Sequence, residues 1–447
     1  MIIQRGFDQR GPWSDMVSRV ALVASFALGG CSGILDVDNP NNLLEDDLSS
    51  PASAPALAAG AGATVARSLG AILGPYSNVT DEVSWRGSRD AWFQLDIGNL
   101  ADPGNEFTDD AFRFVGEGRW MADEAVRRLE AFDAAGQLKS PTGVPDRRPL
   151  VRAYLYGAIS YITIADMFDD FALSDRRSSA PPEGEPNMVQ FYDRAIDHLT
   201  KGLAIARAIN DRGLENDLQA VRARAEYSKV LWDIVNPVGS VVANGLVNAA
   251  AANADATAIL ARAAPEFQVI LRLDTDDIAY AGEASLAYNI NQRGELRIAP
   301  TYSTLTDPIT GQPDPRVQST IADLTAAYVY QDLVIASTRE MRLILAEAAL
   351  AANDIPGFTT HINALRGLDE LTPWAGQIPA LAMLKHERRA NLFLQGRRLA
   401  DLYRWGENSP EWQTAPPSTA VSRRGTFFPI TCIEIRAHPE DFAGTAC

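Results

Sequence analysis

Two stretches without helical periodicity, residues 75–107 and 272–336, combine aromatic rings with hydrogen-bonding side chains. An aromatic plane stacks on the apolar C–H face of a sugar ring, and Asn, Asp, Arg and Gln side chains bond its hydroxyl groups. Loops also carry binding residues more often than the elements they join. The candidate ligand-binding residues are Asp81, Trp85, Arg86, Trp92, Tyr288 and Tyr302. The alternative is that these residues pack the loops onto the rest of the protein.

The side chains that could catalyse a reaction lack the spacing that such chemistry needs. No two histidines stand at metal-ligand spacing, and we find no Gly-rich phosphate loop, no G-x-S-x-G elbow and no Cys–His combination. Carboxylate pairs such as Asp109–Asp110 and Asp169–Asp170 are common in acidic proteins, and glycosidase carboxylates are defined by a separation in space. We therefore expect no metal, no cofactor and no catalysis. The histidines are His198, His361, His386 and His438.

The composition indicates a globular protein of one to three domains. The chain has 447 residues, of which 46% are hydrophobic and 22% charged, and its formal net charge is −17. Such an excess of negative charge argues against nucleic acid as a partner, because phosphate groups would be repelled.

The first 30 residues are typical of a bacterial export signal. Arg19 precedes an apolar run, residues 20–28, that is too short to span a bilayer as a helix. Leu28-Gly29-Gly30-Cys31 then resembles a lipobox, so we expect cleavage before Cys31 and its acylation. The alternative is an ordinary signal peptide followed by a chance cysteine. Met16 would open a shorter signal than Met1, and both starts stay open.

After the signal, we expect a lipidated tether over residues 31–50 and one domain over 51–447. The two aromatic stretches are loop-rich insertions in that domain. No segment after the signal is apolar over a long enough run to predict a membrane span. The protein would therefore be anchored through acyl chains on Cys31, and stable anchoring needs more than one such chain.

Apolar residues at i, i+3, i+4 and i+7 spacing predict a mainly α-helical fold. The helices follow one another with short loops, which favours antiparallel pairs similar to tetratricopeptide (TPR) repeats, although no strict repeat of about 34 residues is present. The predicted helices are 54–73, 109–135, 149–168, 187–207, 216–235, 254–271, 337–352, 357–367 and 385–406.

The last of these helices, KHERRANLFLQGRRLADLYRWG over residues 385–406, is the densest mixture of charged and apolar residues in the chain. Its spacing predicts one continuous amphipathic helix in which Arg397 and Asp401 pair across one turn. Gly396 would lie in mid-helix, where it costs about 1 kcal/mol relative to alanine, so we expect close packing against another backbone. Physical chemistry alone favours a surface helix with solvated charges.

The order of residues in this segment resembles the signature of the SusD/RagB family, ERR…EG.R..DL.RWG. The matching positions are Glu387-Arg388-Arg389, Gly396, Arg398, Asp401-Leu402 and Arg404-Trp405-Gly406. Asn391 and Gln395 depart from the family pattern, in which glutamates stand at these positions. Similar family matches, in the family's order, are residues 150–173, 314–316, 339–350, 361–368 and 426–439.

This resemblance implies a SusD-like α-α superhelix with a loop-rich face, attached to the cell-surface side of the outer membrane through Cys31. It further implies a protein without enzymatic activity that hands oligosaccharides or peptides to a SusC-like TonB-dependent transporter. Two other functions stay open. One is a lipid-anchored, TPR-like scaffold that binds another protein, and the other is a surface glycoside hydrolase.

The cysteines predict a disulfide near the C-terminus. If Cys31 is acylated, Cys432 and Cys447 remain, and a free thiol is a liability in an exported protein. A bridge would close a loop of about 15 residues, which the loop-entropy model values at roughly 3 kcal/mol. The alternative is two unpaired thiols.

Overall fold

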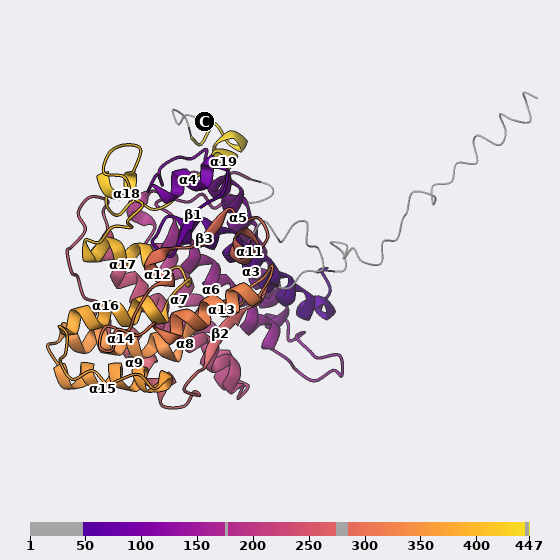
Figure 1. Cartoon of the computed structure of the whole chain (residues 1–447). Coiled ribbons are helices and arrows are strands. Elements are labelled where there is room, and N and C mark those ends of the chain that lie inside the picture. Colours follow the sequence, from indigo (N-terminus) through magenta and orange to yellow (C-terminus); the bar gives the residue numbers. More distant parts are fainter. Residues whose placement is uncertain (1–47, 175–177, 274–284, 443–446) are drawn as a thin grey trace, which may run out of the picture. The chain divides into compact units, whose positions relative to one another are not determined.

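Helices that pack side by side in chain order form the larger part of the protein (Figure 1). The structure is a computed structural model, and it describes residues 48–174, 178–273, 285–442 and 447. Residues Ser49–Cys447 make one compact unit. The predicted export signal, the predicted acylation site Cys31 and nearly all of the predicted tether lie outside the described residues.

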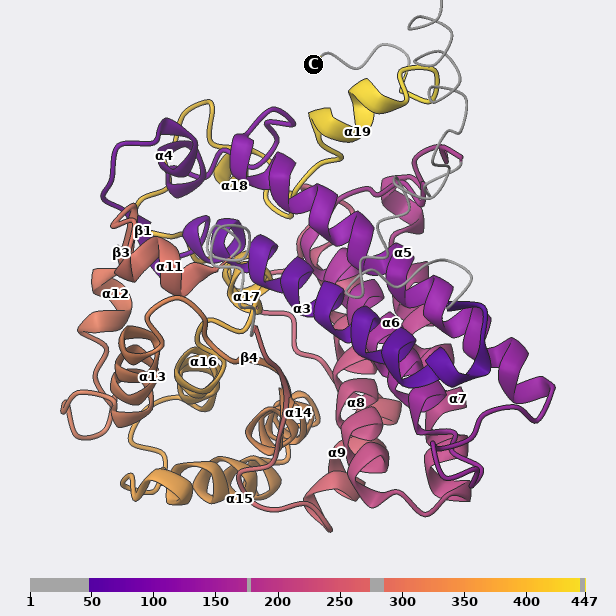
Figure 2. The same cartoon turned by 90° about the vertical axis from the view of Figure 1, so that its right-hand side faces the viewer.

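Each helix of this array packs on the next one along the chain. α5 lies against α3 and α6, α7 lies between α6 and α8, and α9 joins α8 to α14, as Figure 2 shows. Because only three residues separate α7 from α8, the chain reverses direction between them. The prediction of a mainly helical, TPR-like fold is confirmed. The helices are α3 (Ala54–Asn78), α5 (Glu106–Ala134), α6 (Arg148–Met167), α7 (Gln190–Ala208), α8 (Arg212–Val235), α9 (Ala250–Leu260), α14 (Thr338–Ala351), α15 (Ile355–Arg366) and α16 (Ala380–Asn391).

Side-chain caps fix where several of these helices begin. Asn105 accepts hydrogen bonds from the backbone N–H groups of Phe107 (3.1 Å) and Thr108 (3.4 Å) at the start of α5. Asp211 accepts one from Leu214 N–H (3.1 Å) at the start of α8. Such caps satisfy backbone donors that have no partner inside the helix.

The predicted helix over 254–271 is too long. α9 ends at Leu260, and Gln268–Leu271 form strand β2, which pairs antiparallel with β4 (Leu333–Ser337). Pro265 lies between them, and a proline disfavours helical backbone in the residue before it. Val269 and Leu271 are buried along the strand, so tertiary burial decides the conformation of this segment.

The predicted continuous helix over 385–406 is also wrong. The segment breaks after Asn391 into α16 and α17 (Arg398–Trp405). In the connection, Leu394 (φ 59°) and Gly396 (φ 72°) adopt left-handed backbone. A Cβ on Gly396 would lie 2.7 Å from Cε of Met167, so its close neighbour is a side chain and not a backbone. Glycine is favoured here chiefly by the left-handed backbone, because the end of the Met167 side chain can shift.

Shorter elements complete the fold around the two aromatic stretches. Helix α13, in the second stretch, was not predicted; Asp314 caps it by accepting a hydrogen bond from Arg316 N–H (3.1 Å). These elements are η1 (Pro51–Ser53), β1 (Val83–Trp85), α4 (Asp90–Asp96), η2 (Glu185–Asn187), α11 (Leu286–Asn291), β3 (Leu296–Ile298), α12 (Pro300–Ser303), α13 (Pro315–Ala326), η3 (Gly367–Asp369), α18 (Thr419–Ser422) and α19 (Cys432–Ala437).

One helical segment, Pro51–Asn78, meets the length and composition required to cross a membrane, which the sequence reading did not predict. In the structure, 61% of its most apolar window is buried inside the protein. α3, which makes up most of this segment, packs against both α5 and α6. Its apolar composition therefore matches the interior of the helical array.

Candidate ligand-binding face

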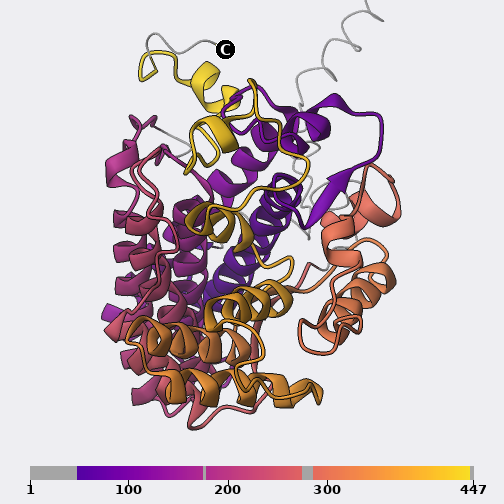
Figure 3. The same ribbon diagram turned by 60° about the vertical axis from the view of Figure 1, so that its left-hand side comes forward.

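The two aromatic stretches, far apart in the sequence, meet on one side of the protein. β1 from the first stretch pairs antiparallel with β3 from the second, with Val83 opposite Ile298 and Trp85 opposite Leu296. Figure 3 shows these two segments side by side. We call the surface formed by α4, β1, α11 and β3 the loop-rich face.

Glu295 holds the turn that follows β1. Its carbonyl oxygen accepts hydrogen bonds from the N–H groups of Arg86 (2.9 Å) and Gly87 (3.1 Å). Its carboxylate accepts from the N–H groups of Ser88 (2.9 Å) and Arg89 (3.2 Å). Burial acts to raise the pKa of Glu295, but these donors outweigh it and hold the pKa below its usual value. A Cβ on Gly87 would overlap this carboxylate, so only glycine fits.

A cavity of about 410 Å³ opens between α3, α5 and α11 beside this turn. We call it the loop-face cavity. Its volume falls within the range of roughly 300–1,000 Å³ that small-molecule sites occupy. Trp92, Phe107 and Tyr288 contribute rings to its lining, and Arg89, Arg113 and Arg293 contribute guanidinium groups.

Three of the six predicted ligand-binding residues lie at or near the surface of this face. Tyr288, in α11, is half-buried and lines the loop-face cavity. Trp85 is half-buried, and its ring packs at a tilt on Phe93 with 5.3 Å between centroids. Arg86 is exposed in the turn that Glu295 holds. Ligand binding by these three residues stays a prediction.

The other three residues are nearly or fully buried, and ligand binding by them also stays a prediction. Trp92 is 2% exposed and stacks on Phe107 at 3.7 Å. Tyr302 is fully buried and stacks on Phe393 at 4.3 Å. Asp81 is 5% exposed. Each of these two rings is stacked on another ring, which favours packing, the alternative that the sequence left open.

Asp81 is held in a two-point ion pair. Its carboxylate oxygens accept from Nε (2.7 Å) and Nη2 (2.9 Å) of Arg398, one of the family-signature residues. Burial acts to raise the pKa of Asp81, and the positive charge of Arg398 outweighs it, so the pKa lies below its usual value. Asp81 therefore joins the first aromatic stretch to α17.

Sequence reasoning missed the arginines of the loop-face cavity. Arg89 lies over the ring of Phe107 at 4.7 Å and pairs with Glu106 at 2.5 Å. Arg113 lies over Phe114 at 4.6 Å and pairs with Asp110. The signal that could have identified them is basic residues among aromatic residues in a strongly acidic chain.

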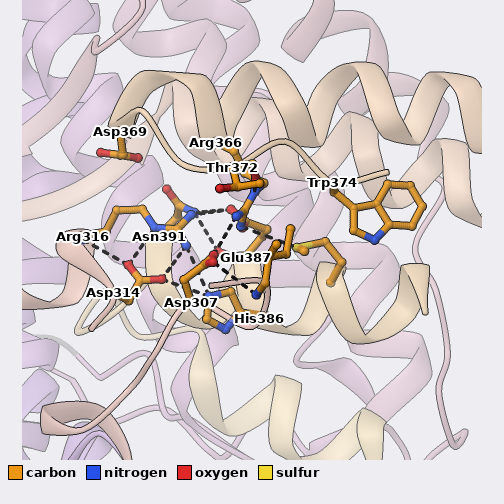
Figure 4. Close-up of polar contacts among 12 residues, drawn as sticks. Asp307, Asp314, Arg316, Arg366, Asp369, Thr372, Trp374, His386, Glu387 and Asn391 are labelled. Carbon is orange, nitrogen blue, oxygen red and sulfur yellow. Dashed lines mark hydrogen bonds and ion pairs between the residues drawn. The ribbon is translucent and has the colours of Figure 1, made fainter. Parts of the chain in front are cut away.

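The charged residues of the family signature are buried and ion-paired, not solvated as physical chemistry alone suggested. Glu387 is fully buried; it accepts from Arg366 Nη1 at 2.8 Å and from Arg316. Arg366 also donates to Asp307 (2.7 Å), and Arg316 to Asp314 (2.6 Å). Figure 4 shows these contacts, which join α13, α15 and α16. We call this group the signature network.

The network continues from α16 into α17 and α14. Asp401 accepts from Arg388 Nε (2.9 Å) and from Arg404 Nε (2.9 Å). Arg404 also donates to the buried Glu347 of α14. Arg397 pairs with Glu340 of α14 at 2.9 Å, so the predicted pairing of Arg397 with Asp401 is wrong. Breaking such buried pairs is costly, because one partner is left charged away from water.

A second cavity, of about 580 Å³, lies between α13, α16 and the β2–β4 pair. It is lined by both residues that depart from the family pattern, Asn391 and Gln395. Asn391 donates to Glu387 Oε2 (3.2 Å) and accepts from Arg339 (3.0 Å), so it keeps a place in the signature network. No sequence pattern indicated this cavity, because α13 was not predicted.

Within the described ranges, no group of three or more His, Cys, Asp or Glu side chains could hold a metal ion. His386 contacts Asp314 at 3.0 Å in the signature network. Of the carboxylates considered for catalysis, Asp170 accepts from the N–H groups of Phe171 and Gly184, both at 2.8 Å. Asp109 accepts from Ile433 N–H at 2.7 Å.

The structure places Cys432 and Cys447 in a disulfide, with 5.5 Å between their Cα atoms. Cys432 opens α19, and its N–H donates to the carbonyl oxygen of Pro103 at 2.8 Å. The C-terminal residue is thereby joined to a helix that also contacts α5.

Comparison with known proteins agrees with this fold. The family model described as the SusD family matches residues 338–432, which span α14 to the start of α19. No match is found among curated proteins. Among solved structures, a SusD superfamily protein from Bacteroides vulgatus is similar at 13% identity with a TM-score of 0.58, covering 86% of this chain and 96% of that one.

Two further solved structures are similar over most of their length. One is a SusD superfamily protein from Bacteroides fragilis, at 16% identity with a TM-score of 0.58, covering 87% of this chain and 97% of the other. The second is surface glycan-binding protein A from Bacteroides uniformis, at 14% identity with a TM-score of 0.54, covering 82% and 92%. The resemblance to the SusD family is therefore confirmed over residues 338–432, and the predicted SusD-type fold is confirmed over most of the chain.

Proposed function

We propose that this protein captures a saccharide on its loop-rich face and delivers it to a SusC-like TonB-dependent transporter. The observation that carries the proposal is the meeting of two distant aromatic stretches beside a cavity of about 410 Å³ on a SusD-type fold. A structural relative with this fold is a surface glycan-binding protein. A peptide ligand is the second outcome that the resemblance implies.

Binding would use a largely preformed surface. Glu295 fixes the turn over residues 86–89, and the β1–β3 pair fixes the two stretches relative to each other. Preorganisation of this kind lowers the entropy cost of binding. Tyr288 and Trp85 would contact the ligand, and no step of catalysis is part of the proposal.

A glycan and peptide binding screen on the full chain, purified in detergent, tests this function. We expect binding to at least one class of oligosaccharide and no hydrolysis of it. Binding to peptides alone would change the ligand class. Release of shorter sugars would instead support the hydrolase alternative, and binding to neither class would support a protein-interaction scaffold.

Attachment to the outer membrane through Cys31 is the second part of the proposal. It rests on the lipobox-like residues 28–31, which lie outside the described residues. We expect Cys31→Ala to release the protein from the outer-membrane fraction or to block its processing, as measured by fractionation and immunoblotting. Unchanged retention in the membrane would contradict the anchor.

A further inference from the structure

The loop-face cavity differs in charge from the chain as a whole. The formal net charge of the chain is −17. Among the residues that the structure describes, the lining of the cavity nevertheless has three arginines, Arg89, Arg113 and Arg293, against two acidic residues, Glu106 and Asp110. A cavity with a positive lining on a negative protein attracts anions locally while the rest of the surface repels them.

The aromatic rings beside this cavity are already covered by other groups. Phe107 stacks on Trp92 at 3.7 Å, and the guanidinium of Arg89 lies 4.7 Å from its centroid. Phe114 has Arg67 at 4.4 Å and Arg113 at 4.6 Å. A ligand in the cavity therefore meets guanidinium groups before it meets the faces of these two rings. For Tyr288, no ring or guanidinium contact is found within the described part of the chain.

Within the described residues, Arg293 is the arginine of this lining that forms no direct ion pair; its charge acts at longer range on the carboxyl group of Glu295, whose pKa it helps to lower. Arg293 is exposed, and among the residues that the structure describes no carboxylate forms an ion pair with it. Its backbone N–H donates to the carbonyl oxygen of Tyr288 at 3.0 Å, which fixes its position just after α11. Arg89 and Arg113, by contrast, pair with Glu106 and Asp110 at 2.5 and 2.7 Å.

We propose that the loop-face cavity takes an acidic saccharide, with Arg293 binding a uronate carboxylate and Tyr288 stacking on a sugar ring of the same ligand. A guanidinium presents two parallel N–H donors that match the two oxygens of a carboxylate, which gives both affinity and orientation. This inference rests on the proposed function and narrows its ligand class.

The test compares each acidic oligosaccharide with its own neutral form. The probes are tetramers of galacturonate, mannuronate and glucuronate, and the same tetramers with every carboxylate reduced to a hydroxymethyl group. Titration calorimetry on the full chain in detergent gives both affinities. At least one acidic tetramer is expected to bind about tenfold more tightly than its reduced form, with a smaller advantage at high salt because exposed charges are screened.

The variant Arg293→Gln removes this positive charge and should abolish most of the preference for the acidic tetramer. We expect the affinity for the acidic tetramer to fall about fivefold, and the affinity for the reduced tetramer to change less than about twofold. Arg293→Lys should retain part of the preference, because the charge remains without the fork of donors. Arg212→Gln is the matched control: Arg212 is 78% exposed on α8. It removes the same charge and should leave the preference unchanged.

Each other outcome overturns the inference. Equal affinity for acidic and reduced tetramers would contradict it while leaving saccharide capture in place. A preference that survives in Arg293→Gln would place the anion elsewhere. If the protein bound none of the tetramers but did bind uncharged polysaccharides of other linkage, the acidic ligand would be rejected. If it bound no saccharide at all, both this inference and the proposed function would be rejected.

Discussion

The signature network and the loop-rich face use arginine in opposite ways. In the network, Arg366 and Arg404 are fully buried, and each is matched by at least one carboxylate. On the loop-rich face, Arg86 and Arg293 are exposed, and no ion pair to either is found within the described ranges. The charged residues of the signature network therefore hold helices together, and the residues available to a ligand lie on the loop-rich face.

This difference has a physical reason. A buried arginine is tolerated only with its partners in place, so changing one residue of the network affects several others. An exposed arginine loses little when its surroundings change. A substitution on the loop-rich face is therefore expected to destabilise the fold less than a substitution in the signature network.

The largest expected effect comes from breaking the signature network. Glu387→Gln removes the carboxylate shared by the buried Arg316 and Arg366. We expect the free energy of unfolding to fall by about 3–5 kcal/mol, because two guanidinium groups lose a buried partner. Urea unfolding of the full chain in detergent measures this change.

The control for this variant is an exposed ion pair. Asp197 and Lys201 in α7 pair at 2.9 Å, and their side chains are 57% and 49% exposed. Asp197→Ala should change the free energy of unfolding by less than about 1 kcal/mol. Similar losses in the two variants would mean that burial of the network contributes nothing special.

A smaller effect is expected at the break between α16 and α17. Gly396→Ala places a Cβ in left-handed backbone and 2.7 Å from Met167 Cε, so we expect a loss of about 1–3 kcal/mol in unfolding free energy. Gly116→Ala in α5 is the matched control, because no atom lies within 4 Å of the added Cβ.

The control should have the opposite sign. Alanine is favoured over glycine inside a helix, so Gly116→Ala should stabilise the protein by about 0.5–1 kcal/mol. If Gly396→Ala were also neutral or stabilising, the connection would not require glycine.

The smallest effect concerns pH, and it involves two buried carboxyl groups, Glu82 and Asp96. Burial raises the pKa of Glu82, which accepts from Leu394 N–H at 2.7 Å, to about 7. Burial likewise raises the pKa of Asp96, in α4, to about 7, with a further contribution from the negative charge of Glu411. Both groups therefore hold a proton in the folded state at pH values where the unfolded chain has lost it.

The sign follows from proton linkage. As pH rises from about 4.5 to about 7, the folded state binds more protons than the unfolded state, so the free energy of unfolding contributed by these groups falls. Glu82→Gln and Asp96→Asn should each make the fall between pH 5 and pH 8 shallower in urea unfolding. An unchanged slope in both variants would place the titrating groups elsewhere.

Most of the fold could be predicted, because helices bury one face at a regular spacing. The predicted helix over 149–168 differs by one residue at each end from α6 (Arg148–Met167). The break after Asn391 could not be predicted, since the apolar spacing continues through Leu392 and Leu399 while the left-handed backbone at Leu394 depends on tertiary contacts. The ion-pair partners of Arg397 and Arg404, which are Glu340 and Glu347 of α14, likewise could not be predicted from residues 385–406 alone.

The candidate site was predictable only as a pair of stretches. Composition identified both, and β1–β3 pairing brings them together. Composition did not separate the half-buried Tyr288 from the buried Trp92 and Tyr302, which stack on Phe107 and Phe393. The exposure of an aromatic ring depends on residues that are distant in the chain. Arg293 was not among the predicted binding residues, because arginines are commonly exposed on protein surfaces.

The most direct test of the division between network and face is the affinity of the double variant Trp85→Ala, Tyr288→Ala for the saccharide that the screen identifies. We predict a loss of about tenfold or more, because two stacking contacts contribute roughly 1–3 kcal/mol together, with an unfolding free energy that stays within about 1 kcal/mol of the parent. Undiminished affinity in a folded double variant would contradict the assignment of ligand binding to the loop-rich face.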